Sequence, residues 1–166
     1  MHDRNTPLRA ALIAAAAGCV PLALAATAFA HVEPMTNHVP KAGARGVITM
    51  HIEHGCKNAA GTLFDTNRIT TQPPKAFTGV TVPAHAGWTG TVTRTSTGTR
   101  VTWTANGTTL GKHTPGAFKI AVTYPSRKGR YGLPTVQYCG GRSTAWIERT
   151  VNGVEPDFPL PILTVR

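Results

Sequence analysis

The sequence predicts an all-β protein, an antiparallel immunoglobulin-like β-sandwich that forms a single domain after a cleaved leader. Threonine, valine and isoleucine dominate the segments between frequent glycines and prolines. Several of these segments alternate apolar and polar residues, and none shows a helical period. About eight short strands separated by closely spaced turns are typical of such a sandwich.

The leader is residues 1–30, in which Arg4 and Arg9 precede a long apolar run. The run ends at the small-x-small sequence 28–30, which is typical of a signal peptidase site. We therefore expect an exported protein, periplasmic or extracellular, whose mature chain begins at His31. The alternative is lipoprotein processing before Cys19, although Ala16 stands where a bulky aliphatic residue is usual.

Residues 31–166 have the size of one domain. The predicted strands follow one another with short turns, and residues 96–98 indicate a hairpin. Their ranges are 47–52, 61–70, 77–82, 92–94, 100–104, 117–124, 135–139, 145–149 and 160–165.

Alternation in the first of these strands assigns its faces. Ile48 and Ile52 share the presumed core face, whereas His51 and Glu53 lie on the other face. If the alternation continues, His54 joins the core face at the end of the strand, as does Cys56. Segment 117–124 alternates in the same way. Its even-numbered residues share one apolar face, and they are Phe118, Ile120, Val122 and Tyr124.

Two cysteines, Cys56 and Cys139, remain after the leader is removed. An even pair in an oxidising compartment predicts a disulfide, which would contribute about 2 to 4 kcal/mol. The alternative is a two-thiolate site for copper(I) or zinc, but neither cysteine belongs to a CxxC pair.

A mature chain that begins with His31 offers an α-amine and a ring nitrogen from one residue, which can chelate a metal, and this geometry suits copper. The amine loses its proton readily, because its pKa is about 7.7 to 8.0.

Several short segments together resemble the YcnI-like family of exported copper-binding domains. They are His31-Val32, His54-Gly55-Cys56, Gly87-Trp88, Val101-Thr102-Trp103, Val136-Gln137-Tyr138-Cys139, Trp146-Ile147-Glu148 and Leu163-Thr164-Val165. The resemblance implies an immunoglobulin-like sandwich that binds copper(II) through His31, His54 and Trp146. An indole N–H has no lone pair, so Trp146 would act by shielding the metal or by a cation–π contact.

The chain departs from the family at one ligand. Some relatives use a glutamate at the position that aligns with Gly55, so His54 is the natural substitute here and Glu53 the next candidate. The resemblance does not explain His51, nor Met35, whose thioether could bind copper(I).

The net charge of +10 includes one basic cluster, residues 127–130, and no basic stripe with interleaved aromatic residues. We therefore expect no nucleic-acid partner, and peripheral contact with anionic polymers or lipids of the cell envelope remains open.

No hydrolase motif is present either. The favoured interpretation is a non-enzymatic copper protein of homeostasis or trafficking, with a membrane copper transporter or another copper protein as partner. The alternatives are a copper-dependent oxidative enzyme of the histidine-brace type and a metal-free module that binds the envelope.

Overall fold

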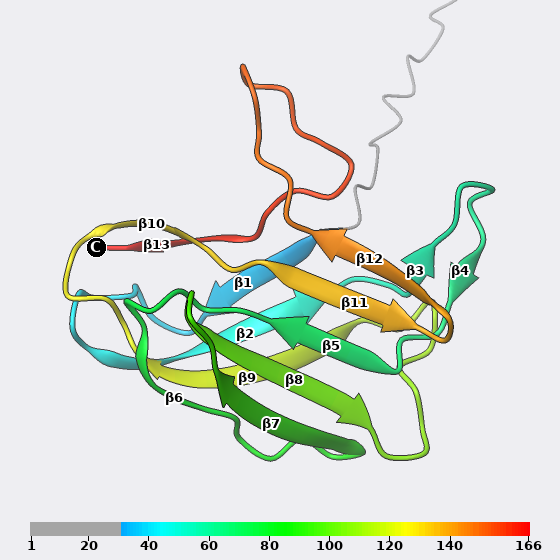
Figure 1. The fold of residues 1–166 in the computed structure, drawn as a ribbon, viewed down its shortest axis with the longest axis horizontal. Helices are drawn as coiled ribbons and strands as arrows, with labels where there is room; N and C mark the ends of the chain where they lie inside the picture. The colour runs from blue at the N-terminus through cyan, green and yellow to red at the C-terminus, as the bar shows by residue number, and fades with distance from the viewer. Residues whose placement is uncertain (1–30) are drawn as a thin grey trace, which may run out of the picture.

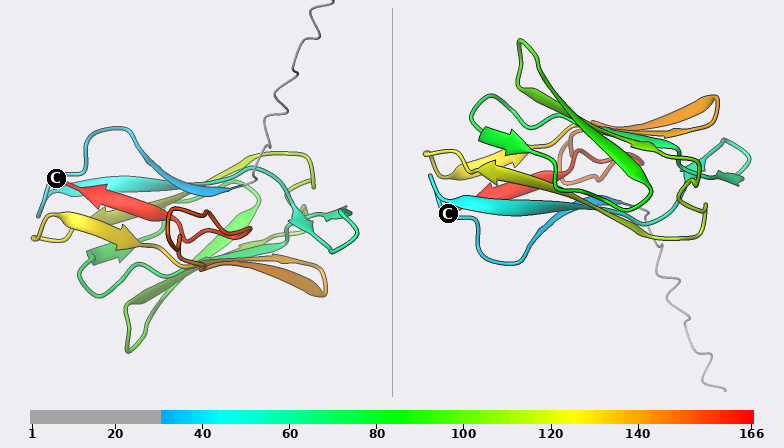
Figure 2. Two further views of the ribbon diagram at one scale, coloured as in Figure 1. Left: turned by 90° about the horizontal axis from the view of Figure 1, so that it is seen from above. Right: turned by 90° about the horizontal axis from the view of Figure 1, so that it is seen from below.

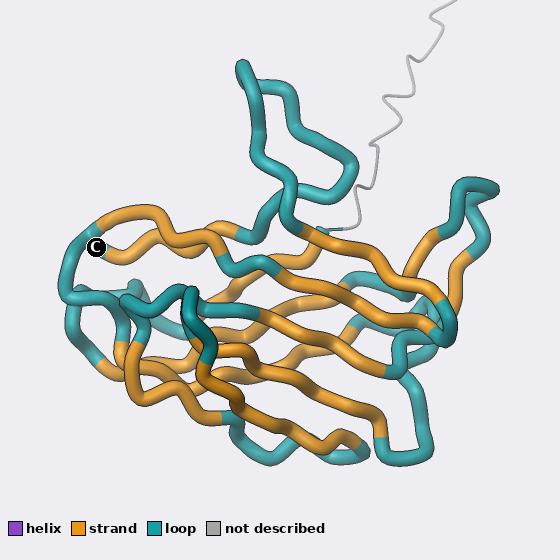
Figure 3. The backbone as a smooth tube through the Cα atoms, viewed as in Figure 1, coloured by secondary structure: helices purple, strands orange, loops and turns teal. Residues whose placement is uncertain are grey.

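The structure is a computed structural model that describes residues 31–166; the predicted leader, with Cys19, lies outside the described residues. This part of the chain consists of strands and loops (Figure 3). No helix within it could cross a membrane. The thirteen strands are β1 Val32–Thr36, β2 Arg45–Ile52, β3 Cys56–Lys57, β4 Leu63–Phe64, β5 Arg68–Thr71, β6 Thr78–Thr81, β7 Trp88–Arg94, β8 Thr99–Ala105, β9 Gly116–Thr123, β10 Gly129–Gly132, β11 Thr135–Cys139, β12 Arg142–Trp146 and β13 Ile162–Val165.

Two antiparallel sheets pack face to face (Figure 2). One has the strand order β1-β2-β9-β6, and the other has the order β12-β11-β5-β8-β7. The β10–β13 pair lies along one edge, and the short β3–β4 ribbon projects at one end (Figure 1). The predicted antiparallel sandwich is confirmed.

The core lies between the two sheets, and the predicted alternation builds it. In β2, Ile48 and Ile52 are buried, and in β9 the side chains of Phe118 and Ile120 are buried as well. Ile48 pairs with Ile120 across the two strands, so these inward residues contact one another in a single layer. Trp103 of β8 closes the core from the opposite sheet and is fully buried.

Several strand boundaries differ from the prediction. Segment 61–70 divides into β4 and β5, because Thr66 leaves the ladder and forms an isolated bridge with Leu110. β12 begins at Arg142 rather than at 145, because the chain reverses within residues 139–142, where Gly140 has a φ of 65°. β2 ends at Ile52, as its predicted range does, but the alternation does not continue to His54, which lies in a turn and is half-buried.

The sequence did not predict β1, β3 or β10. Strand β1 contains Pro34, which disfavours a central strand, but β1 is an edge strand and tolerates it. The other two contain two and four residues, too few to display a periodic pattern.

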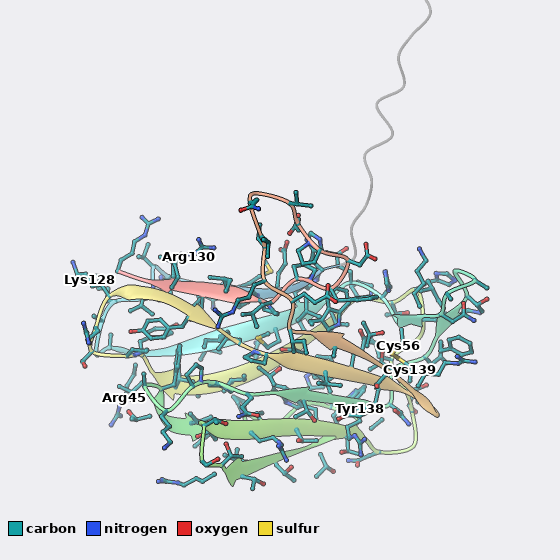
Figure 4. The ribbon with its side chains drawn as sticks, turned by 45° about the horizontal axis from the view of Figure 1, so that its top comes forward. Arg45, Cys56, Lys128, Arg130, Tyr138 and Cys139 are labelled. Atoms are coloured by element: carbon teal, nitrogen blue, oxygen red, sulfur yellow. A yellow bond between two sulfur atoms is a disulfide. The ribbon has the colours of Figure 1, made fainter. Side chains whose placement is uncertain are left out.

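The predicted disulfide is present. Cys56 and Cys139 are joined across 83 positions of sequence with their Cα atoms 5.9 Å apart, and the bond ties β3 to the end of β11 (Figure 4). The backbone N–H of Cys56 also donates to the Cys139 sulfur over 3.0 Å. The segment after β2 is thereby fixed against the five-stranded sheet.

Candidate metal site

His31 precedes β1 directly and is placed by the pairing of β1 with β2. Val32 pairs with Ile52, and extending this register by one residue puts His31 opposite Glu53. The His31 side chain is 21% exposed, and its Nε2 atom lies 3.8 Å from Oε1 of Glu155. Glu155 approaches from a distant loop and was not among the residues predicted from the sequence.

The loop of residues 147–161, between β12 and β13, carries Glu155. It folds back on itself, because the Glu148 N–H donates to the Phe158 carbonyl and the Leu160 N–H donates to the Glu148 carbonyl, over 3.1 and 2.7 Å. The Glu148 carboxylate accepts a further bond from the Phe158 N–H, at 3.3 Å. The loop rises from the end of β12 beside the start of β1 (Figure 1).

Trp146 is the last residue of β12 and is 4% exposed. Phe158 of the same loop packs against the indole in an edge-on arrangement, with ring centroids 5.5 Å apart. The buried Nε1 atom of Trp146 has no hydrogen-bond partner among residues 31–166. Trp103 shares this feature deep in the core, so Trp146 is distinguished only by its position at the start of the loop that carries Glu155.

His54 lies in the turn after β2, where it is half-buried. Its Nδ1 atom lies 2.5 Å from the Gly55 carbonyl oxygen, a contact that holds the proton on Nδ1 and leaves the lone pair on Nε2. The His54 carbonyl accepts a bond from Nε2 of Gln137, at 2.6 Å. Gln137 pairs with Thr144, two residues before Trp146, so His54 is anchored near the same strand.

Gly55 occupies a position that admits no side chain. Its N–H donates to the Lys112 carbonyl, and a Cβ atom would lie 1.9 Å from the Phe64 carbonyl oxygen. A glutamate at this position, as the resemblance implies for some relatives, does not fit this backbone. The carboxylates that remain near His31 are Glu53 by register and Glu155 by direct contact.

Two further candidates lie on the first two strands, β1 and β2. The Nδ1 atom of His51 is 3.5 Å from Oε1 of Glu53, so these two residues share a face, as predicted. Met35 is four residues along β1 from His31, about 13 Å away, and pairs with Thr49.

The donor atoms around His31 fit a metal ion in spacing. A ring nitrogen and a carboxylate oxygen that share one ion at about 2.0 to 2.2 Å each lie at most about 4 Å apart. The 3.8 Å between Nε2 of His31 and Glu155 is within that span. A chelate with the α-amine of His31 uses Nδ1 instead, so the ring would have to turn before the amine, the ring and Glu155 could share one ion. No three His, Cys, Asp or Glu side chains in residues 31–166 form a metal-binding group by themselves, so a complete site needs another donor.

A family model described as "Domain of unknown function (DUF1775)" matches residues 31–165. The chain belongs to this family. DUF1775 is the YcnI-like domain, and its match begins at His31, the residue that the leader prediction places first. No curated protein matches the chain.

Among solved structures, the DUF1775 domain is similar to an uncharacterised protein from Nocardia farcinica with an immunoglobulin-like fold. The two are 24% identical with a TM-score of 0.68, over 81% of this chain and 97% of the other. This likeness supports the fold.

Proposed function

We propose that this DUF1775 domain is an extracytoplasmic copper(II)-binding protein of copper homeostasis or trafficking, and that it is not an enzyme. The observation that carries the proposal is the contact of His31 with Glu155, at the residue where the family match begins. A histidine there gains a second nitrogen donor, its α-amine, once the leader is removed after Ala30.

The donor set proposed for copper combines nitrogen and oxygen atoms from three segments. His31 supplies Nδ1 of its ring together with its amine, which requires a turn of the ring because Nε2 is the atom that faces Glu155. Glu155 supplies a carboxylate that offsets part of the charge of the ion. His54 has Nε2 as its available ring donor, because its Nδ1 is held by the Gly55 carbonyl. It would join the ion only if the turn that carries it moved, because no three His, Cys, Asp or Glu side chains in residues 31–166 form a metal-binding group as they stand. A nearby carbonyl that fixes the tautomer of a histidine is a common second contact of metal-binding histidines.

Trp146 would contribute without binding the metal through nitrogen. Its buried ring and the ring of Phe158 form an apolar wall beside the loop that holds Glu155. Such a wall restricts access of water and limits the room for additional ligands. An indole N–H with no protein acceptor can also donate to an oxygen ligand of the ion.

The placement of Glu155 suits a carrier. Its side chain is 51% exposed and lies on a loop, so a partner protein can reach the ion from that side and replace this ligand. The proposed partner is a membrane copper transporter or another copper protein, with copper as the cargo.

The test uses exported protein whose N-terminus has been verified as His31 by mass spectrometry. Copper(II) titration followed by electron paramagnetic resonance should show one bound ion with nitrogen couplings. His31→Ala should abolish this signal, whereas His113→Ala, in an exposed loop, should leave it unchanged. A chain with one additional alanine before His31 keeps the ring and displaces the amine, and it should bind copper more weakly.

Glu155 is tested separately from the histidines. Glu155→Gln should weaken binding, whereas Asp157→Asn, with the same change of charge in the same loop, should not. Unaltered copper binding in both His31→Ala and Glu155→Gln would overturn the proposal. Oxygen consumption by the copper-loaded protein with a reductant would favour the oxidative enzyme instead.

A further inference from the structure

Cations gather at the end of the sandwich opposite the candidate metal site. Arg45 begins β2, whereas Ile52, the partner of Val32, ends it about 24 Å away. Figure 4 shows Arg45, Lys128 and Arg130 together at the end remote from the disulfide. We call this end the basic pole. Its cations are Lys41, Arg45, Arg127, Lys128, Arg130 and Arg166, and all six side chains are exposed.

Backbone hydrogen bonds join the segments that carry these cations. The N–H of Tyr124 donates to the Ala44 carbonyl over 2.8 Å, and the N–H of Gly43 donates to the Pro125 carbonyl over 3.0 Å. These bonds fasten the loop before β2 to the end of β9. Arg127 and Lys128 lie in the loop before β10, and the Tyr131 hydroxyl of β10 donates to the Arg127 carbonyl over 2.6 Å, which ties this loop to the strand.

The basic pole has no compensating negative side chains. Residues 34–52, 66–147 and 158–166 contain neither Asp nor Glu, and these three stretches include every cation of the pole. Both ion pairs found in residues 31–166 involve a histidine at the other end, His31 or His51. The potential of the pole is therefore positive and is available to an external anion.

Exposed apolar side chains accompany the cations. A hollow between the loop before β2 and the strand itself is lined by Lys41, Arg45, Val39, Val47 and Tyr124, among others. Val39 is 57% exposed and Val47 is 38% exposed. Cations interspersed with exposed aliphatic side chains are characteristic of surfaces that settle into the headgroup region of a bilayer.

We propose that the basic pole docks on the surface of an anionic lipid bilayer. Its lysines and arginines bind lipid phosphates, and Val39 enters the apolar boundary beneath them. A wholly polar wall polymer would engage the cations but would gain nothing from the exposed valines. The docking does not depend on metal binding, so it can be tested on the metal-free protein.

The experiment measures co-sedimentation of the protein with phosphatidylcholine vesicles, with and without phosphatidylglycerol. We expect binding only to the anionic vesicles, and weaker binding as salt increases. Each cation near such a surface contributes about a fivefold change in affinity, so Lys128→Gln with Arg130→Gln should weaken binding roughly 10- to 30-fold. Lys57→Gln with Lys112→Gln removes the same charge at the opposite end and should change it little.

The apolar part is tested with Val39→Ser, which keeps every charge. It should weaken binding to anionic vesicles several-fold and leave binding to soluble polyglutamate unchanged. Absence of vesicle binding, or equal losses in the two double variants, would overturn the proposal. Binding to polyglutamate without vesicle binding would assign the pole to an anionic polymer instead.

Discussion

Gln137 donates a hydrogen bond from Nε2 to the carbonyl oxygen of His54, across 2.6 Å and 83 positions of sequence. The same amide nitrogen contacts Oγ1 of Thr66, also at 2.6 Å. Gln137 is fully buried, so one polar side chain connects the turn after β2 with the middle of β11 inside the protein.

Replacement of this amide should destabilise the fold. Gln137→Met has nearly the same volume but leaves the His54 carbonyl without its buried donor, which should cost about 1 to 3 kcal/mol. Urea unfolding followed by tryptophan fluorescence measures the change. Gln72→Met, at a half-buried site beside the same sheet, is the control and should lower the free energy of unfolding by less. Equal losses of stability in the two variants would mean that the hydrogen bond to the His54 carbonyl makes no particular contribution.

A side chain at position 55 should not be tolerated. Gly55→Ala places a methyl group 1.9 Å from the Phe64 carbonyl oxygen, and Gly55 cannot retreat because its N–H is bonded to Lys112. We expect a loss of about 1 to 3 kcal/mol or more in thermal or urea unfolding. Gly141→Ala is the matched control, because a Cβ atom there has no neighbour within 4 Å. Similar stability of the two variants would contradict the geometry at Gly55.

The disulfide should account for a large part of the stability. The double variant Cys56→Ser with Cys139→Ser opens a loop closed across 83 positions, and we expect a loss of roughly 2 to 5 kcal/mol. Reduction of the natural protein should give the same midpoint in urea as the double variant. A variant as stable as the oxidised protein would show that β3 is held by packing alone.

Tyr124 should make the protein sensitive to alkali. Burial raises the pKa of its phenol above the ordinary value of 10.0, because the charged form is poorly solvated there. The neutral phenol therefore contributes stability that is complete below the unfolded pKa and is lost as pH rises through the folded pKa. Unfolding free energies measured from about pH 8 to 11 should fall less steeply for Tyr124→Phe. Parallel pH curves for the two proteins would exclude this role.

The parts of the fold that the sequence predicts best are central strands with one buried face. In β2 and β9 every second residue must be apolar, so the alternation around Ile48 and Ile120 revealed both strand and face. The pairing of Cys56 with Cys139 was also predictable, since no other cysteine follows the leader. Local pattern and simple counting were sufficient in these cases.

The residues of the candidate site could be predicted less completely from the sequence. His54 departs from the alternation because the chain turns after Ile52, at a glycine packed against the Phe64 backbone and a cysteine tied to β11. Glu155 lies in an irregular loop 124 positions from His31, and only the fold of that loop brings them together. A carboxylate in such a loop carries no periodic signal that could indicate its partner.

The separation of charge along β2 also gives the domain an electric dipole. Most of its acidic side chains, among them Glu33, Glu53 and Glu155, belong to segments near His31, whereas the basic pole has no Asp or Glu. A dipole of this direction experiences a torque in the field of any negatively charged surface, before contact is made. The domain would approach such a surface already turned, with the His31 end facing away from it and open to a protein arriving from solution.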